Sequence, residues 1–564
     1  MQQTLILLLL SSLLLACGGG GGGGGGSTPN PPPPGGSTPP PPAPVAPTQA
    51  ELEQAASFLR LTTFGASYDE IEQLAREDVD TWLQQQFARP ATSHLNVVVR
   101  YGDEYGYDPN GPITPGLYRR FAFWESAVNG DDQLRQLVAY ALGQIFVVSD
   151  NVGMLFNDPT ALSSYHDTLA AHAFGNFRDL LLAVTLHPAM GVYLSHVNNG
   201  RSDPLANTFP DENYAREVMQ LFSIGLFELN ADGTQVLDTA GNPIPTYDNA
   251  DIREFSKIFT GLSYGPAEPG GSSFFGKRAP VLYVPMEMFE EFHEPGEKFL
   301  LNGQVVPDGQ SGMRDVEDAI DNLFNHPNVG PFIGRQLIQR LVTSNPSPEY
   351  VARVSAAFAG DGVTPRGDMR AVLRAILLDP EAASASRLQE PFRRYVALNR
   401  ILQSAAEDGS VPGAGFVAQF LTQQHVLSAP SVFNFYLPNF SPSGVLGDAG
   451  LVSPEFQITN ASTVVGVTNL VAYALFAEQS IDSPEELGRP ITPNFSEFEA
   501  LAADPDALLD RIDLLFFAGN LGDSTRQILR TAIEGAGPDP TLRVQVGLYL
   551  ALASPEGAVV GGQE

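Results

Sequence analysis

The chain has 564 residues, a formal net charge of −33 and a single cysteine. This acidic excess argues against nucleic acid or an anionic lipid surface as a partner, because both bind clustered cations. One cysteine allows neither an intramolecular disulfide nor a thiolate metal site in the folded part.

The first residues are typical of an export signal. Residues 5–15 are apolar apart from two serines, and Ala16 and Cys17 follow them. The run is too short for a membrane span, which needs about 20 apolar residues. A small residue before a cysteine resembles the lipobox of bacterial lipoproteins, which implies cleavage after residue 16 and a diacylglycerol on Cys17. The alternative is an ordinary signal peptide with a chance cysteine, since the segment contains no Lys or Arg.

A spacer rich in glycine and proline comes next. Nine glycines at 18–26 predict a flexible coil, and the proline-dense run 29–47 favours polyproline II, with a reach of roughly 60 Å. We therefore expect a signal peptide over 1–16, a lipidated cysteine with a disordered linker over 17–47, and a folded body over 48–564. Gly18 after the cysteine favours the outer membrane or cell surface, by the sorting rules of lipoproteins.

The body is predicted to be mainly α-helical, with many helices in one globular unit. Apolar residues recur at helical spacing through most of it. The predicted helices cover residues 51–61, 68–87, 117–128, 133–148, 177–184, 251–259, 316–323, 329–341, 351–358, 369–378, 391–402 and 507–517.

Two segments break the helical pattern and predict small β-hairpin inserts. The first, near 227–250, contains two turn-forming groups around a short apolar stretch. The second lies near 264–310 and includes a strand, Asn-Gly turn, strand signal over 298–306. Both flank the predicted helix 251–259, where such hairpins would build a lip or a groove.

A polar helix face is the strongest candidate for a catalytic site. The sequence predicts one helix from Asp211 to about Leu226, on which Asn213, Arg216 and Glu217 share a face. In a cleft, Arg216 would bind a carboxylate or phosphate, and Glu217 would act as an acid, base or ligand. The alternative is an ordinary solvated face. For the cleft, we expect Arg216 and Glu217 to be at least half buried and paired with each other or across helices.

An oxygen-rich cluster near the first hairpin is a candidate calcium site. Asn230, Asp232, Asp248 and Asp251 provide hard oxygen ligands around a turn glycine, which Ca²⁺ prefers. No bidentate glutamate stands at the EF-hand position. Turn and helix-cap chemistry explains the same residues without a metal.

Several sequence blocks carry a family resemblance. They are Asn-Tyr-Ala-Arg-Glu at 213–217, His-Pro-Ala-Met-Gly-Val-Tyr-Leu at 187–194, Phe-Thr-Gly-Leu at 259–262, Pro-Ser-Val-Phe-Asn-Phe-Tyr at 430–436 and Gly-Leu-Val-Ser-Pro-Glu-Phe-Gln at 450–457, with others at 173–180, 358–362 and 376–380. Together they resemble the bacterial Domain of Unknown Function 1800 (DUF1800) family over about residues 55–555. The sequence departs from this family at His187 and Ser195, where relatives commonly have Asp.

The resemblance implies a mostly helical, secreted or surface protein of no settled activity, often encoded beside an exported family of sulfatase-like character. The sequence contains no Gly-x-Ser-x-Gly elbow, phosphate loop or compact zinc spacing. We therefore expect a surface-anchored lipoprotein that binds a ligand or a neighbouring protein in a cleft around residues 164–262. The alternative is an extracellular hydrolase that uses Glu217 and Arg216 in that cleft.

Overall fold

A computed structural model describes residues 46–108, 114–266, 275–276, 281–413, 416–477 and 490–561. The chain from Pro47 to Glu564 forms one unit. The predicted signal peptide, Cys17 and most of the predicted linker lie outside the described residues. The described part is mainly helical with small two-stranded antiparallel sheets, which confirms the predicted fold class.

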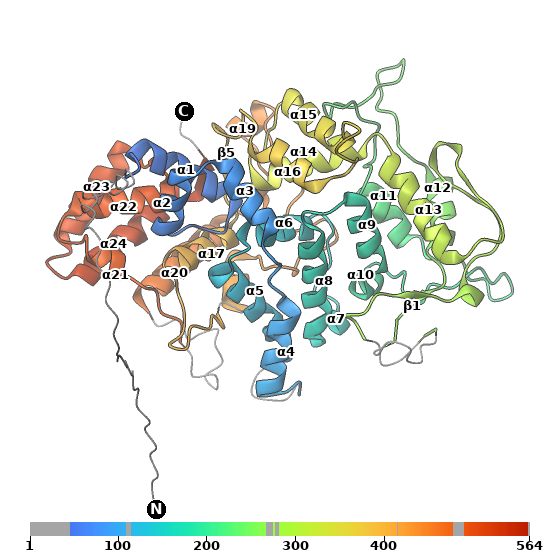
Figure 1. Ribbon diagram of the computed structural model, residues 1–564, viewed down its shortest axis with the longest axis horizontal. Helices are drawn as coiled ribbons and strands as arrows, with labels where there is room; N and C mark the ends of the chain where they lie inside the picture. The colour runs from blue at the N-terminus through green and yellow to red at the C-terminus, as the bar shows by residue number, and fades with distance from the viewer. Residues whose placement is uncertain are drawn as a thin grey trace, which may run out of the picture. The chain divides into compact units, whose positions relative to one another are not determined.

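The two ends of the unit pack together, although they lie far apart in the sequence (blue and red in Figure 1). Helix α1 contacts α22 and β6, and α17 contacts both α5 and α20. On α1, Leu52, Ala55 and Leu59 form a buried stripe at helical spacing, and Thr48 caps the helix. The elements of this part are α1 (Gln49–Thr62), α2 (Tyr68–Arg76), α3 (Val79–Ala88), α4 (His94–Tyr105), η1 (Pro115–Leu117), α5 (Tyr118–Asn129), α17 (Pro391–Ile401), α18 (Phe416–Thr422), α19 (Val445–Asp448), η4 (Pro454–Gln457), α20 (Ala461–Phe476), α21 (Ser496–Glu499), α22 (Pro505–Phe517), α23 (Asp523–Gly535), α24 (Pro540–Ala553) and η6 (Glu556–Ala558).

The central part of the chain forms the rest of the helical body. Helix α6 packs against α8 and α14, and α13 packs against α9 and α12. Its helices are α6 (Gln133–Gly143), α7 (Gly153–Asn157), α8 (Pro159–His172), α9 (Phe177–Leu186), α10 (Pro188–Tyr193), α11 (Asn213–Gln220), α12 (Asn249–Ile258), α13 (Gly312–Asn325), α14 (Val329–Leu341), α15 (Pro348–Ala359) and α16 (Met369–Leu377). One continuous apolar core joins this part to the two ends of the unit.

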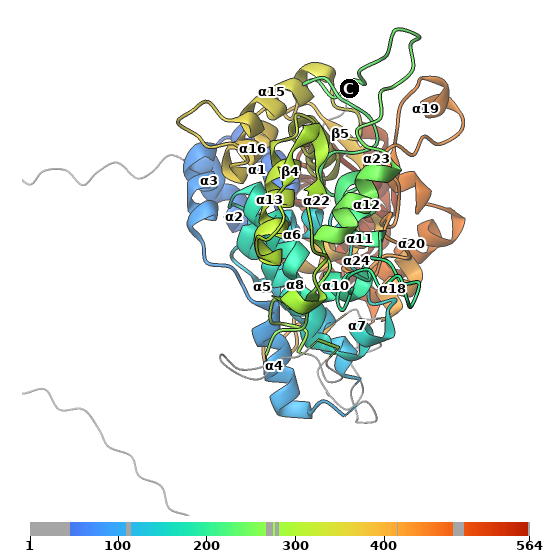
Figure 2. The same cartoon turned by 90° about the vertical axis from the view of Figure 1, so that its right-hand side faces the viewer.

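Both predicted hairpin inserts are present. Near the first, isolated antiparallel bridges join residues 227 and 245, 229 and 235, and 237 and 243, and the extended loop between α11 and α12 projects from the body (Figures 1 and 2). In the second, β3 and β4 pair across the 3₁₀ turn η3. The strands and 3₁₀ turns at the second insert are β1 (Leu262–Ser263), β2 (Glu287–Met288), η2 (Glu290–Phe292), β3 (Lys298–Phe299), η3 (Leu301–Gly303) and β4 (Val305–Val306). A separate sheet pairs β5 (Ser386–Leu388) with β6 (Val559–Gly561).

Two of the predicted helices are interrupted before their expected ends. The predicted helix 68–87 divides into α2 and α3, because Glu77 is extended and the Asp78 carboxylate accepts from the backbone of Thr81 to start the second helix. The predicted helix 133–148 ends with α6 at Gly143. Beyond it, the Tyr165 hydroxyl donates to the carbonyl of Phe146, which replaces a helical hydrogen bond.

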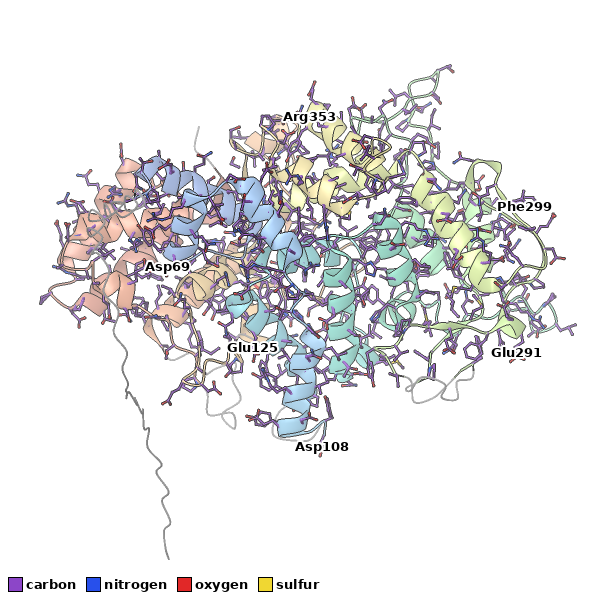
Figure 3. All side chains as sticks on the ribbon, in the orientation of Figure 1. Asp69, Asp108, Glu125, Glu291, Phe299 and Arg353 are labelled. Atoms are coloured by element: carbon purple, nitrogen blue, oxygen red, sulfur yellow. The ribbon has the colours of Figure 1, made fainter. Side chains whose placement is uncertain are left out.

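The acidic excess is displayed on the outside of the unit. Asp69, Asp108 and Glu291 are exposed, and Asp108 and Glu291 lie at its margins in Figure 3. Within the described ranges, no helix combines the length and the apolar character needed to cross a membrane.

Candidate functional site

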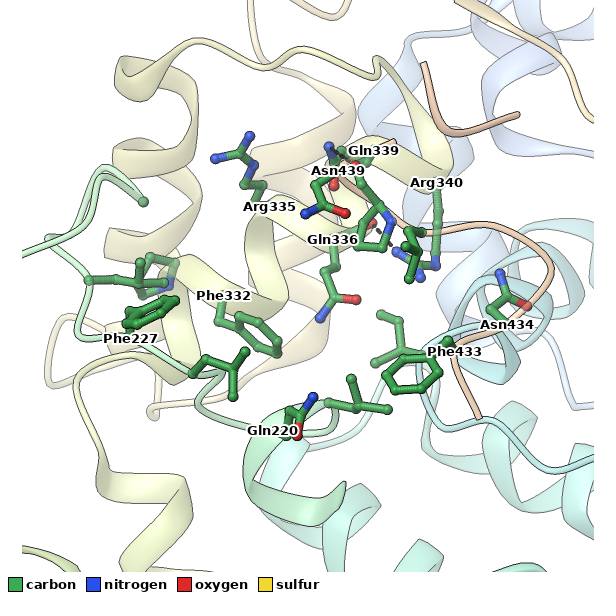
Figure 4. A pocket seen from close by; sticks show the side chains of 18 of the residues that line it. Gln220, Phe227, Phe332, Arg335, Gln336, Gln339, Arg340, Phe433, Asn434 and Asn439 are labelled. Atoms are coloured by element: carbon green, nitrogen blue, oxygen red, sulfur yellow. Dashed lines mark hydrogen bonds between the residues drawn. The ribbon is translucent and has the colours of Figure 1, made fainter. Parts of the chain in front are cut away.

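A cavity of about 700 Å³ lies where α14 meets the ends of α6 and α11, the loop after α11 and the segment 432–439 (Figure 4). Half of the 22 residues that line it are apolar: Ile145, Leu221, Leu226, Phe227, Leu229, Pro331, Phe332, Val432, Phe433, Leu437 and Pro438. Seven more carry side-chain amides: Gln144, Gln220, Gln235, Gln336, Gln339, Asn434 and Asn439. The remaining four are Gly233, Thr234, Arg335 and Arg340. We call this the amide-lined cavity.

Helix α14 forms the longest wall and holds the others in place. The residues of α14 that line the cavity are three or four positions apart and therefore share one face of the helix. On the other face, Ile333, Leu337 and Leu341 are buried in the core. The Gln339 Nε2 donates to the carbonyl of Pro438 at 3.1 Å, and an Arg340 guanidinium nitrogen donates to the carbonyl of Gln144 at 3.0 Å. The segment 432–439 and the end of α6 are therefore both attached to α14.

The loop after α11 is attached to the start of α14 by one buried amide. The Asn328 side chain donates to the carbonyls of Ile224 and Phe227, both at 2.8 Å, and accepts from the amide of Leu229 at 2.9 Å. Gly225 has φ +74°, and a Cβ there would lie 2.8 Å from the ring of Phe332. Glycine is therefore required where this loop crosses the cavity wall.

Three polar side chains of the cavity have atoms that are buried and unpartnered. They are the Gln336 Nε2, the Asn434 Nδ2 and the Arg340 Nε. In Figure 4, Gln336 points from α14 into the space between Phe332 and Phe433. Asn434 has φ +65°, a backbone conformation that asparagine tolerates better than most residues. All three atoms are hydrogen-bond donors, so this wall has an excess of donors.

The cavity also lacks negative charge. Its lining contains no Asp or Glu, although the chain as a whole has 64 of them. Burial lowers the pKa of Arg340, and partial desolvation by the cavity wall lowers that of Arg335, although the Arg335 residue is exposed to solvent. Arg335 is exposed at the rim and forms no ion pair with any described residue. An uncompensated cation at the mouth of an acid-free cavity attracts anions.

A buried carboxylate lies behind the cavity wall. Glu390, only 1% exposed, accepts from the hydroxyls of Tyr140 and Tyr436 and from the amides of Gln144 and Gln424. Burial raises its pKa, but the charge of Arg393 and the tyrosine hydrogen bonds outweigh this and hold the pKa below its usual value. The network fixes Gln144, whose side chain belongs to the cavity lining.

The predicted catalytic face is only partly brought into a cleft. Glu217 is 7% exposed, one of its oxygens has no partner, and burial raises its pKa against the opposing charge of Arg216. The side chain of Arg216 is 40% exposed and pairs with Glu212 one turn earlier at 3.2 Å. The prediction that both side chains are at least half buried is thus confirmed, but the predicted pairing with each other or across helices is wrong. Asn213 is exposed, and none of the three candidates lines the amide-lined cavity.

The helix that carries these residues is shorter than predicted. It covers Asn213–Gln220 instead of 211–226. After it, the amides of Phe222 and Ile224 bond to carbonyls five residues back, which widens the last turn and ends the helix. As a result Gln220, at the end of the same polar face, reaches the cavity.

The four predicted calcium ligands serve turns and a helix cap. Asp232 accepts from the amide and hydroxyl of Thr234, and the Asn230 amide donates to the same hydroxyl. Asp248 and Asp251 form a reciprocal capping box at the start of α12. In the described part of the chain, no three His, Cys, Asp or Glu side chains are grouped to hold a metal ion. These contacts are the turn and helix-cap chemistry that the sequence allowed as the alternative to a metal.

The fold and the cavity define a mainly helical protein with a large pocket whose lining has no acidic residue. Residues 57–559 match the family described as "Protein of unknown function (DUF1800)", and the chain belongs to this family. No curated protein and no solved structure matches the chain.

Proposed function

We propose that this chain is a lipid-anchored binding protein of the bacterial surface, and that it holds an extracellular peptide segment in the amide-lined cavity. The buried donors without partners carry the proposal. A buried donor that has no acceptor costs about 1–3 kcal/mol, and a ligand that supplies the acceptor recovers it. The cavity volume of about 700 Å³ is in the range of ligand pockets.

The composition of the lining favours a peptide. Eleven apolar residues suit aliphatic and aromatic side chains, and seven side-chain amides match the donor and acceptor pair of a peptide unit. A sugar would place many hydroxyls against the apolar half of this wall without hydrogen bonds. The lipobox at Cys17 supports display outside the cell, and the sulfatase-like exported neighbour implied by the family is a candidate source of the peptide.

Binding is favoured over catalysis because of what the lining lacks. Among its 22 residues the hydroxyl of Thr234 is the one candidate nucleophile, and the lining has no His, Asp, Glu, Cys or Lys. The Asp232 carboxylate accepts from this hydroxyl, but the hydrogen bonds from Thr234 lower the pKa of Asp232 and make it a weak base. Nucleophilic and acid–base catalysis need a base of suitable pKa within hydrogen-bond reach.

A peptide array tests the proposal. Labelled full-length protein in detergent is applied to random hexapeptides attached through their N-termini. We expect a subset to bind the wild type, to lose binding to Gln336→Leu and to keep it with Gln84→Leu, a variant of an exposed glutamine on α3. Absence of peptide binding, or binding to an oligosaccharide panel instead, would contradict the proposed ligand.

An enzyme remains the second candidate because of the environment of Glu217. Its burial and raised pKa are properties of general acids. The negative charge of Glu217 also contributes, after burial, to raising the pKa of Tyr193 and of Tyr247 to about 12. Cleavage of bound hexapeptides by the wild type, lost in Glu217→Gln, would favour this function over simple binding.

A further inference from the structure

We infer that the ligand carries a carboxylate, and that Arg335 at the rim of the amide-lined cavity binds it. This inference rests on the proposed binding function and names the chemistry that the site selects. The carboxylate is either the C-terminus of the peptide or an acidic side chain.

The first argument compares the charged residues of the cavity lining with those of the whole chain. About one residue in nine is acidic in the whole sequence, so 22 residues at that average would include two or three acids. The cavity lining has none, and it has two arginines. In a protein with net charge −33, the lining itself carries two positively charged side chains and no negatively charged one. Such a lining concentrates anions and repels cations.

The second argument separates the roles of the two arginines. Arg340 is 6% exposed and donates to the carbonyls of Gln336 and Gln144, so its guanidinium holds the wall together. Arg335 lies one turn earlier on α14, is exposed, and makes no hydrogen bond or ion pair with a described residue. Its five donors are free for a planar anion, which a guanidinium binds through two parallel hydrogen bonds.

The third argument is the direction of the Gln336 side chain, whose Nε2 also lacks a hydrogen-bond partner. The side chain of Gln336 follows Arg335 on the same helix and is directed into the cavity (Figure 4). Rotation about its last bond, a soft torsion, is enough to present its Nε2 to a ligand oxygen. In Figure 4 the Arg335 guanidinium is turned outward, away from Gln336, so a ligand bound to both would extend from the rim into the cavity.

The same array of hexapeptides tests the inference when each sequence is printed in matched forms. One pair differs in the C-terminus, as a free carboxylate or an amide, and the other differs in one residue, as Glu or Gln. The proteins compared are the wild type, Arg335→Gln and Arg253→Gln. Arg253 is an exposed arginine on α12, outside the cavity, with no ion pair in the described residues.

We expect the carboxylate form of at least one pair to bind the wild type about three- to tenfold more tightly than its neutral form. Arg335→Gln should abolish this preference while still binding the neutral peptides, and Arg253→Gln should keep it. The pair that responds identifies the source of the carboxylate. Equal binding of charged and neutral forms to the wild type would overturn the inference and leave the binding function standing. If no peptide binds at all, the binding function itself fails.

Thermal melting of each variant shows whether it folds, and a salt titration gives an independent measurement. The preference for the carboxylate should decrease as ionic strength rises, because exposed charges are screened. A preference that survives Arg335→Gln would assign the carboxylate to another group and overturn the role of Arg335.

Discussion

Replacing Gln336 with leucine should stabilise the unliganded protein while removing its ligand binding. Gln336 is 9% exposed, and its Nε2 is buried without a hydrogen-bond partner. A buried donor of this kind costs about 1–3 kcal/mol, and leucine of similar size removes the donor and adds apolar contact. Selection for function commonly maintains such destabilised positions in binding sites.

The expected shift in melting temperature follows from the size of the unit. At about 2.1 cal/mol/K per residue, the unit of Pro47–Glu564 unfolds with an entropy of about 1.1 kcal/mol/K, so Gln336→Leu should raise Tm by about 1–3 °C. Differential scanning calorimetry at neutral pH without ligand measures this shift.

A second buried glutamine provides the matched control. The Gln133 side chain donates to the carbonyls of Ser126, Ala127 and Gly130 and accepts from the amide of Phe64. Gln133→Leu breaks four hydrogen bonds at about 0.5–1.5 kcal/mol each and should lower Tm by about 2–5 °C. A fall in Tm for Gln336→Leu comparable to this control would refute the reasoning, because it would mean that the Gln336 side chain already forms stabilising hydrogen bonds.

Three other changes have defined outcomes. If Cys17 is lipidated, Cys17→Ser should move the protein to the soluble fraction, whereas deletion of 18–47 should not; fractionation and immunoblotting decide this. Burial raises the pKa of Glu217, so the folded state holds its proton above pH 4.5, the ordinary value, and stability falls as pH rises through the raised pKa. The Tm advantage of Glu217→Gln over the wild type should therefore grow over this pH range, and a constant difference would contradict the burial. Asn328→Leu breaks three hydrogen bonds of the cavity loop and should lower Tm by about 2–4 °C and weaken peptide binding, and unaffected binding would show that the loop does not shape the site.

The sequence predicted helices best where apolar periodicity was strong. The predicted helix 329–341 has the same bounds as α14, and the strand–turn–strand signal at 298–306 became β3 and β4. Other helices were missed, including α20 and α24. Helix α20 is apolar on most sides, and so its pattern lacks the polar face on which the prediction relied.

The cavity could not be predicted because its walls come from five separate parts of the chain. The polar residues of α14, Arg335 and Gln336 among them, lie in a correctly predicted helix but look like an ordinary solvated face. The block at 430–436 was noted for its family resemblance, and it contributes Phe433 and Asn434 to the lining. Neither segment alone indicates a pocket, since only the packing of the folded chain brings the two segments face to face.

The structure also explains how a cavity with unpartnered donors can persist. The charge-assisted hydrogen bonds from Gln144 and Tyr436 to the buried Glu390 fix the end of α6 and the segment after Phe435 in place. Because α14 is attached to both through Gln339 and Arg340, the wall cannot close around Gln336 without breaking these bonds. A rigid site whose donors are left unsatisfied rejects ligands that lack acceptors, since such ligands would leave the donors buried and unpaired. The unpartnered donors that cost the empty protein stability are therefore the physical basis of the proposed preference for a ligand rich in acceptors.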